Sequence, residues 1–210
     1  RSGGLNVKEL EASVERVQNL KGKRNKRFTS NFVSDEAGKE LSLEVARKAV
    51  DMNGNIYLSP RGNGKLVIFP KLSSLAGRIF IEKECLDEGQ FIKNLFQSFE
   101  VDKGDLNIHI VGFDPEESQI EKLKNLSTQS DETFFFCFDA HLYSGCRRLL
   151  ESLQDSAKHL VVILLRDPYD HEFVRENVPC LTAFGFRKVQ IQAILERIFQ
   201  SQITRAHQHI

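Results

Sequence analysis

A polar loop directly after the most apolar stretch of the chain carries the residues best suited to chemistry. Residues 160–165 read Leu-Val-Val-Ile-Leu-Leu, and they are followed by Arg166, Asp167, Pro168, Tyr169 and Asp170. A run without polar residues, bounded by charge and proline, is typical of a strand buried on both faces of a parallel sheet. Because ligands bind outside the carboxyl ends of such strands, this loop is the first candidate for a site.

Two histidines near aspartates raise the alternative of an independent hydrolase. His141 or His171 could act as an acid or base with Asp139 or Asp170. Neither pair has a nucleophile at a recognisable spacing, and Ser144 does not lie in a G-x-S-x-G elbow. The sequence therefore does not favour this alternative.

Metal and cofactor motifs are not found. The four cysteines, none of them in a C-x-x-C pair, are Cys85, Cys137, Cys146 and Cys180. We expect buried thiols, no metal, no cofactor and a reducing, cytoplasmic location. The segment Arg-Gly-Asn-Gly-Lys at residues 61–65 lacks the spacing of a phosphate loop and is predicted to be a tight connection between two strands.

The charge of the chain does not point to nucleic acid or to a membrane. The 210 residues carry 29 basic and 29 acidic side chains. A basic cluster at residues 21–27 reads as a solvated helix end, and the aromatic run at residues 133–138 as a core strand. No apolar run approaches the ~20 residues of a membrane span. The abrupt start at Arg1 indicates a piece of a longer protein.

Hydrophobic periodicity predicts alternating helices and strands from residue 36 to residue 200. We expect helices near residues 6–21, 36–52, 86–99, 114–126, 144–153 and 188–199. We expect strands near residues 55–58, 65–69, 79–81, 106–111, 133–138 and 160–165, and another at 180–186. Asn6 and Asp114 are predicted helix caps, and Asn53-Gly54 a helix stop. The predicted fold is α/β, a three-layer α/β/α sandwich with a mostly parallel sheet.

Several of these segments together resemble a known family. The loop Arg166-Asp167-Pro168-Tyr169-Asp170 and the turn Leu181-Thr182-Ala183-Phe184-Gly185-Phe186 resemble the C-terminal domain of glycoside hydrolase family 3, in its two-domain β-N-acetylglucosaminidase branch. Residues 44–58 are similar to the segment that opens that domain, and residues 5–21 to the last helix of the preceding (β/α)8 barrel. Two departures are Asp167, where the family usually has Asn, and the end soon after Phe199.

The resemblance implies a division of the chain and a set of roles. Residues 1–35 would be the last barrel helix plus linker, residues 36–200 the sandwich, and residues 201–210 a frayed tail. The nucleophilic aspartate and the His-Asp acid/base pair of the branch lie on the barrel, so no residue here inherits a catalytic role. The implied partners are the barrel and, through it, a carbohydrate.

The expected function is that of a C-terminal accessory domain of a β-N-acetylhexosaminidase-like enzyme, which acts on β-linked N-acetylglucosamine such as that of cell-wall fragments. Arg166, Asp167, Tyr169 and Asp170 are the predicted substrate-binding residues. A structural role is the alternative, in which Asp170 caps the turn into residues 171–173 and Pro168 fixes the loop. The second hypothesis for the whole chain is a free-standing flavodoxin-like module that binds a small ligand or a partner at its strand-end crevice.

Overall fold

A computed structural model describes residues 7–24, 35–58, 64–79, 81–99 and 106–206. The chain divides into two units, Arg1–Lys39 and Glu40–Ile210, and each is described by itself. The helices are α1 (Val7–Arg24), α2 (Asp35–Ala49), α3 (Glu88–Gln97), α4 (Glu117–Gln129), α5 (Ser144–Ser156) and α6 (Lys188–Ala206). The strands are β1 (Asp51–Asn53), β2 (Lys65–Pro70), β3 (Leu106–Val111), β4 (Glu132–Cys137), β5 (Leu160–Leu164) and β6 (Cys180–Thr182).

The second unit is built on a six-stranded sheet with the order β1-β6-β5-β4-β2-β3. Strands β2 to β6 are parallel, and only β1 runs antiparallel, at the edge beside β6. The parallel strands follow the flavodoxin-like order, in which the strands are added first on one side of β2 and then, from β4 onward, on its other side. The predicted three-layer sandwich with a mostly parallel sheet is confirmed.

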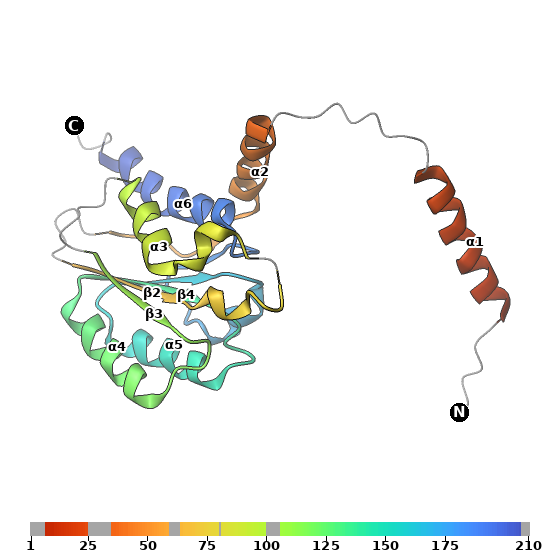
Figure 1. Cartoon of the computed structure of the whole chain (residues 1–210). Helices are drawn as coiled ribbons and strands as arrows, with labels where there is room; N and C mark the ends of the chain where they lie inside the picture. Colours follow the sequence, from red (N-terminus) through yellow and green to blue (C-terminus); the bar gives the residue numbers. More distant parts are fainter. Residues whose placement is uncertain (1–6, 25–34, 59–63, 80, 100–105, 207–210) are drawn as a thin grey trace. The chain divides into compact units, whose positions relative to one another are not determined.

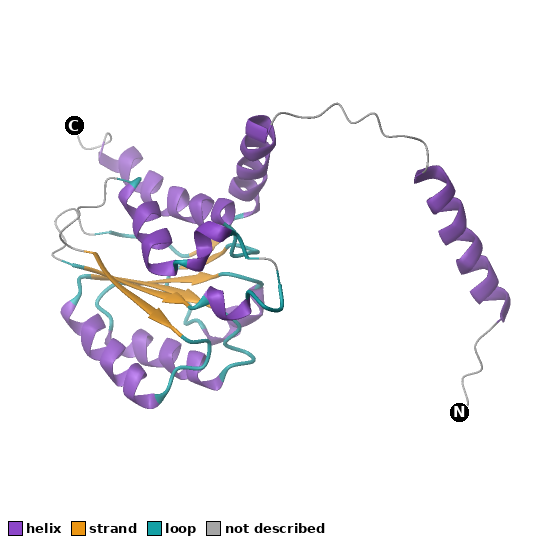
Figure 2. Cartoon of the chain, in the orientation of Figure 1, coloured by secondary structure: helices purple, strands orange, loops and turns teal. Residues whose placement is uncertain are grey.

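Two hydrophobic cores cover the two faces of the sheet, because side chains alternate along each strand. On β4, Phe134 and Phe136 join the core that contains α3 and α6, whereas Phe135 and Cys137 join the core that contains α4 and α5. Figures 1 and 2 show the two helix pairs on opposite faces of the sheet. All six β4 residues are buried, as the apolar run predicts for a strand covered on both sides.

The predicted boundary between the first sandwich helix and the sheet is wrong. Residues 51–52, expected to be helical, and Asn53, expected to stop the helix, form β1, whose Met52 pairs with Leu181 of β6. Residues 55–58, expected to be a strand, have no regular structure, although Ile56 is buried. Pairing with a strand distant in sequence outweighs the local helical pattern here. The backbone turns after the strand at Gly54, whose φ is +83°.

Two further expectations differ from the structure in the middle of the chain. Ile79 and Ile81 are not in a strand, and Phe80 lies outside the described residues. Helix α4 begins at Glu117 with Glu116 as its cap, not with Asp114. Glu116 and Gln119 form a reciprocal capping box, which satisfies two backbone donors at once. Asp114 instead accepts from the backbone N–H of Gly145 at 2.6 Å, and so ties the start of α5 to the loop before α4.

The helices at the two ends run further than expected. Helix α1 extends to Arg24, beyond the predicted end near residue 21, and its predicted cap Asn6 lies outside the described residues. Helix α6 extends to Ala206, into the segment expected to fray, and residues 207–210 lie outside the described part. None of the described helices is long and apolar enough to cross a membrane.

A bidentate ion pair joins α2 to α6. The Nε of Arg47 lies 2.5 Å from Oε2 of Glu196, and its second guanidinium nitrogen lies 3.0 Å from Oε1. Glu196 is buried, and the hydrogen bonds from Arg47 hold its pKa below the usual range despite that burial. Paired geometry of this kind is the case in which an ion pair contributes measurably to stability.

Replacing Arg47 with alanine is expected to lower the free energy of unfolding at pH 7, because it removes the bidentate pair with Glu196. Because the folded-state pKa of Glu196 lies below its unfolded value, the contribution is present above the unfolded pKa and is lost as the pH falls through the folded pKa. Urea denaturation at pH 7 and below pH 4 measures this, and the difference from the wild type should shrink at the lower pH. The control is Lys48→Ala, which removes an exposed pair with Glu44 on the same helix and should cost less. A difference that grows in acid would contradict the prediction.

Candidate functional site

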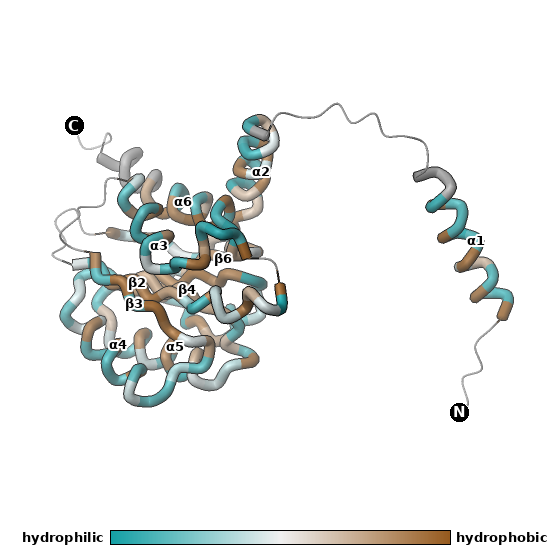
Figure 3. Tube along the Cα trace, viewed as in Figure 1, coloured by the Kyte–Doolittle hydropathy of each residue, from teal (hydrophilic) through white to brown (hydrophobic). Residues whose placement is uncertain are grey.

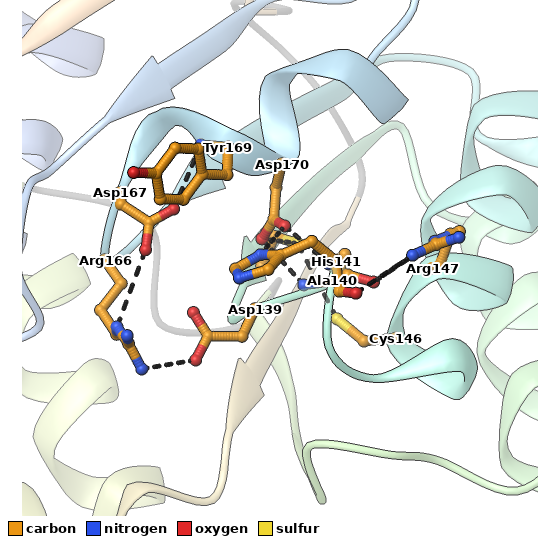
Figure 4. A network of polar contacts seen from close by, with 10 residues as sticks. Asp139, Ala140, His141, Cys146, Arg147, Arg166, Asp167, Tyr169 and Asp170 are labelled. Atoms are coloured by element: carbon orange, nitrogen blue, oxygen red, sulfur yellow. Dashed lines mark hydrogen bonds and ion pairs between the residues drawn. The ribbon is translucent and has the colours of Figure 1, made fainter. Parts of the chain in front are cut away.

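The loops after β4 and β5 meet at one edge of the sheet. The two strands are parallel neighbours, with Cys137 opposite Leu164, so both loops leave the sheet at the same end. Polar side chains from the two loops form a network that we name the strand-end cluster: Asp139, His141, Arg166, Asp167, Tyr169 and Asp170 (Figure 4). The four predicted substrate-binding residues are all in this cluster, beside two residues that sequence reasoning weighed only as a possible acid-base pair.

Asp170 is the buried anchor of the cluster, with an exposed fraction of 3%. One carboxylate oxygen accepts from the backbone N–H of Ala140 at 2.8 Å, and the other from that of His141 at 2.8 Å. The His141 ring nitrogen Nδ1 lies 2.8 Å from the same second oxygen. Asp170 therefore joins the two loops. One interpretation of the sequence predicted that it caps the turn into residues 171–173, and this prediction is wrong.

Asp167 takes the capping role in the loop. Its Oδ1 accepts from the backbone N–H of Tyr169 at 3.1 Å and starts the short 3-10 helix η3 (Pro168–Phe173). Pro168 at the first position of this helix has a φ suited to it and needs no backbone donor. The cap uses Oδ1 only, and the other oxygen, Oδ2, lies 3.8 Å from Nε of Arg166.

Asp139 adopts an uncommon backbone conformation, with a φ of +54°. It is buried, with an exposed fraction of 3%, and its Oδ2 accepts from Arg166 at 2.6 Å. Its Oδ1 is buried and has no hydrogen-bond partner. Burial raises the pKa of the Asp139 carboxyl group, and the charges of Arg166 and His141 oppose that rise. An uncommon conformation together with an unpaired buried oxygen is typical of a functional position.

His141 and Tyr169 complete the exposed side of the cluster. The Tyr169 ring is 68% exposed and packs edge-on against the His141 ring, with centroids 5.7 Å apart. The other candidate histidine, His171, lies elsewhere: its Nε2 is 3.3 Å from the side-chain nitrogen of Asn53. Of the acid-base pairs considered from the sequence, His141 and Asp170 are the pair whose side chains are in hydrogen-bond contact in the structure.

Three possible ligand atoms converge in the cluster. One side-chain atom each from Asp139, His141 and Asp167 lies within 4.8 Å of the others. Spacing in the sequence could not predict this group, because its members come from two loops on different strands. The available signal was the Asp-x-His pair placed directly after the aromatic run.

The crevice where the strand order reverses is filled by aromatic rings. Phe113 stacks on Phe138 with centroids 4.6 Å apart, and on Tyr143 at 5.7 Å. The cavity beside them measures about 10 Å³, at the lower limit for one water molecule. That cavity is too small for a ligand larger than a water molecule.

The cysteines behave as the sequence predicts, as small buried hydrophobic residues. All four are free and buried. Burial raises the pKa of Cys85 and of Cys180 to about 12. The Cys137 thiol lies 3.8 Å from the sulfur of Cys146 and 3.6 Å from an oxygen of Asp170, and these contacts and burial raise its pKa well above the usual value. A protonated, buried thiol is a poor nucleophile, so thiol catalysis is not supported.

No family model and no curated protein matches the chain. Solved structures do match it. The glycoside hydrolase family 3 β-N-acetylglucosaminidase from Paenibacillus sp. strain FPU-7 is 20% identical, with a TM-score of 0.67, over 95% of this chain and 38% of that one. A fungal multi-domain family 3 β-N-acetylglucosaminidase is 18% identical, with a TM-score of 0.61, over 95% of this chain and 23% of that one. A β-glucosidase from Listeria innocua is 12% identical, with a TM-score of 0.56, over 85% and 27%.

The likeness at these identities concerns the fold. The chain spans well under half the length of each of these structures. Neighbours of this kind are consistent with the C-terminal domain of glycoside hydrolase family 3 that the sequence resembles. In these multidomain enzymes the matching region lies in one chain with a catalytic domain, which fits a barrel as the partner.

Proposed function

We propose that this chain, with its fold of the C-terminal domain of glycoside hydrolase family 3, is the non-catalytic second domain of such an enzyme together with the last helix of its barrel. The observation that carries the proposal is the extent of the match. The unit from Glu40 onward makes up about four fifths of the chain. The Paenibacillus structure matches more than this, 95% of the whole chain. We take this extent as support for assigning the N-terminal helix to the barrel, which the sequence resemblance implies.

The apolar stripe on α1 supports the proposal that this helix packs against another domain. Figure 3 shows apolar and polar residues alternating along α1. Four apolar residues recur at helical spacing along the helix and form one stripe, with exposed fractions between 48% and 66%: Leu10, Val14, Val17 and Leu20. An isolated helix of this length is marginally stable in water, so an apolar stripe is expected to pack against another body. In the proposed enzyme, that body is the rest of the barrel.

A second apolar surface lies on the sandwich itself. Leu41 and Val45 of α2 and Phe184 after β6 are between 48% and 60% exposed, and they line one groove with Ala46 and Gln190. Phe184 has a φ of +54°, which a bulky residue rarely adopts without a functional or packing reason. We propose that this groove faces the barrel and that the strand-end cluster lies at the border of the active site.

The substrate and location follow from the resemblance. We propose that the whole enzyme hydrolyses β-linked N-acetylglucosamine, as in cell-wall fragments, because the Paenibacillus and fungal structures are β-N-acetylglucosaminidases. Within it, Arg166, Asp167 and Tyr169 would contact the carbohydrate, and buried Asp170 would hold their loop in place. The four free thiols support a reducing compartment such as the cytoplasm.

The test compares this chain with the full-length protein on 4-nitrophenyl β-N-acetylglucosaminide. The full-length protein should hydrolyse the substrate, and the chain alone should show no turnover above the buffer. In the full-length protein, Tyr169→Ala should raise KM several-fold with little change in kcat, whereas Tyr57→Ala, an exposed tyrosine outside the cluster, should leave both unchanged. Turnover by the chain alone that Asp167→Ala abolishes would overturn the proposal, and so would a full-length protein without a barrel.

A further inference from the structure

We propose that Asp139, His141 and Asp167 form a binding site for a divalent cation that accepts imidazole and carboxylate ligands together, such as Zn²⁺ or Mn²⁺. The three side chains offer one nitrogen and two oxygens within 4.8 Å of one another. They come from neighbouring parallel strands, β4 and β5, whose register holds the two loops at one edge of the sheet. The inference does not depend on the proposed enzymatic function.

The free oxygen of Asp139 is the first sign of a ligand. Its Oδ1 is buried without a hydrogen-bond partner, whereas Oδ2 is held by Arg166. In Figure 4 the free oxygen points away from Arg166, into the space between Asp167 and His141. A buried carboxylate oxygen without a partner destabilises the fold, because it has lost its water and gained no hydrogen bond in exchange. A cation in that space would remove the cost, because it would bind the oxygen directly.

The orientation of His141 is the second sign. Its Nδ1 lies 2.8 Å from Asp170, so in the neutral ring the proton sits on Nδ1 and Nε2 is left with its lone pair. Asp170 is itself held by the backbone N–H groups of Ala140 and His141, which stabilises the ring orientation. A carboxylate that fixes the second nitrogen of a histidine is the usual support of a metal-binding imidazole.

The charges of the cluster also favour a divalent cation. Asp139, Asp167 and Asp170 bring three carboxylates together; Arg166 pairs with Asp139 and Asp167, and the His141 ring contacts Asp170. The Arg166 side chain is 49% exposed, contacts Asp139 at 2.6 Å and faces Asp167 only across 3.8 Å. The carboxylates outnumber the guanidinium group that lies between two of them, which favours a further cation at this edge of the sheet.

The type of cation follows from the ligand set. Imidazole suits Zn²⁺ and related transition metals, and carboxylate suits Mn²⁺ as well, whereas Mg²⁺ and Ca²⁺ prefer oxygen ligands alone. Zinc ligands bind at roughly 2.0–2.2 Å, so the three side chains must close slightly around the ion. Three protein ligands leave at least one position for water or for an oxygen of another molecule, as in open metal sites.

The test is isothermal titration calorimetry of the full chain with ZnCl₂ and with MnCl₂, after treatment with EDTA and dialysis. His207 and His209 stand two residues apart and could bind Zn²⁺ by themselves, so every protein in the series carries alanine at both positions. We expect one ion per chain. His141→Ala and Asp167→Asn should each weaken binding about 10-fold or more. The control His159→Ala, which removes an exposed histidine at the opposite edge of the sheet, should leave the affinity unchanged.

Asp139→Asn separates loss of the site from loss of the fold. Asparagine tolerates the positive φ at this position and removes the unpaired buried charge. The variant should therefore raise the Tm of the metal-free chain by about 2–4 °C while it abolishes binding of both ions. Three results would overturn the inference: no saturable binding of either ion up to about 1 mM, binding that survives all three substitutions, or a lower Tm for Asp139→Asn in the absence of metal.

Discussion

Replacing Asp170 with alanine is expected to lower the free energy of unfolding by about 3–5 kcal/mol, a large fraction of the 5–15 kcal/mol typical of a domain. The carboxylate accepts from the backbone N–H groups of Ala140 and His141 and contacts the His141 ring, and it is buried. Without it, the two backbone donors have no acceptor, and each unsatisfied buried donor costs about 1–3 kcal/mol. The loops after β4 and β5 would lose their common anchor.

Urea denaturation followed by circular dichroism measures this effect, and the midpoint should fall while the slope stays constant. Asp170→Asn keeps one acceptor oxygen and should cost less than Asp170→Ala. The exposed control is Asp155→Ala, which removes a surface pair with Arg175 and should cost under about 1 kcal/mol. A loss for Asp170→Ala as small as that of the control would show that the carboxylate does not hold the loops together.

Replacing Gly145 with alanine is expected to destabilise the protein by about 2 kcal/mol or more, although alanine is the better helix former. Gly145 is the second residue of α5, where propensity alone would predict a gain of up to about 1 kcal/mol. An added Cβ, however, would clash with the backbone oxygen of Pro115 and lie 2.7 Å from an oxygen of Asp114. The same Asp114 accepts from the Gly145 N–H at 2.6 Å, so relief of the clash would lengthen that hydrogen bond. Overpacking against backbone costs about 1–3 kcal/mol and decides the sign.

Gly89 provides a matched control for this prediction. It is the second residue of α3, and the nearest atom to an added Cβ is an oxygen of Asp87 at an ordinary 3.8 Å. Gly89→Ala should therefore be neutral or stabilising in the same urea denaturation experiment. If both variants were stabilised equally, the close approach of α5 to Pro115 would be disproved.

The sequence by itself determined the layers of the fold. The apolar runs of β2, β4 and β5 predicted buried parallel strands. Successive side chains of a strand point to opposite faces of the sheet, so each run contributes to the cores on both faces. Helical periodicity placed α3 and α5 to within a few residues, and it placed the start of α6 at Lys188. The loop at residues 166–170 was located correctly at the carboxyl end of β5, because local hydrophobicity defines where that strand ends.

Only the tertiary structure decided what individual residues in that fold do. Residues 51–53 form a strand because β6 offers them hydrogen-bond partners, which no local pattern records. Asp114 and Asp170 both look like caps in the sequence, yet each accepts from a backbone N–H about 30 positions away. The convergence of Asp139 and His141 on Asp167 has the same cause. Parallel pairing of β4 with β5 brings their loops together, and such long-range contacts depend on the register of the sheet and not on neighbouring residues.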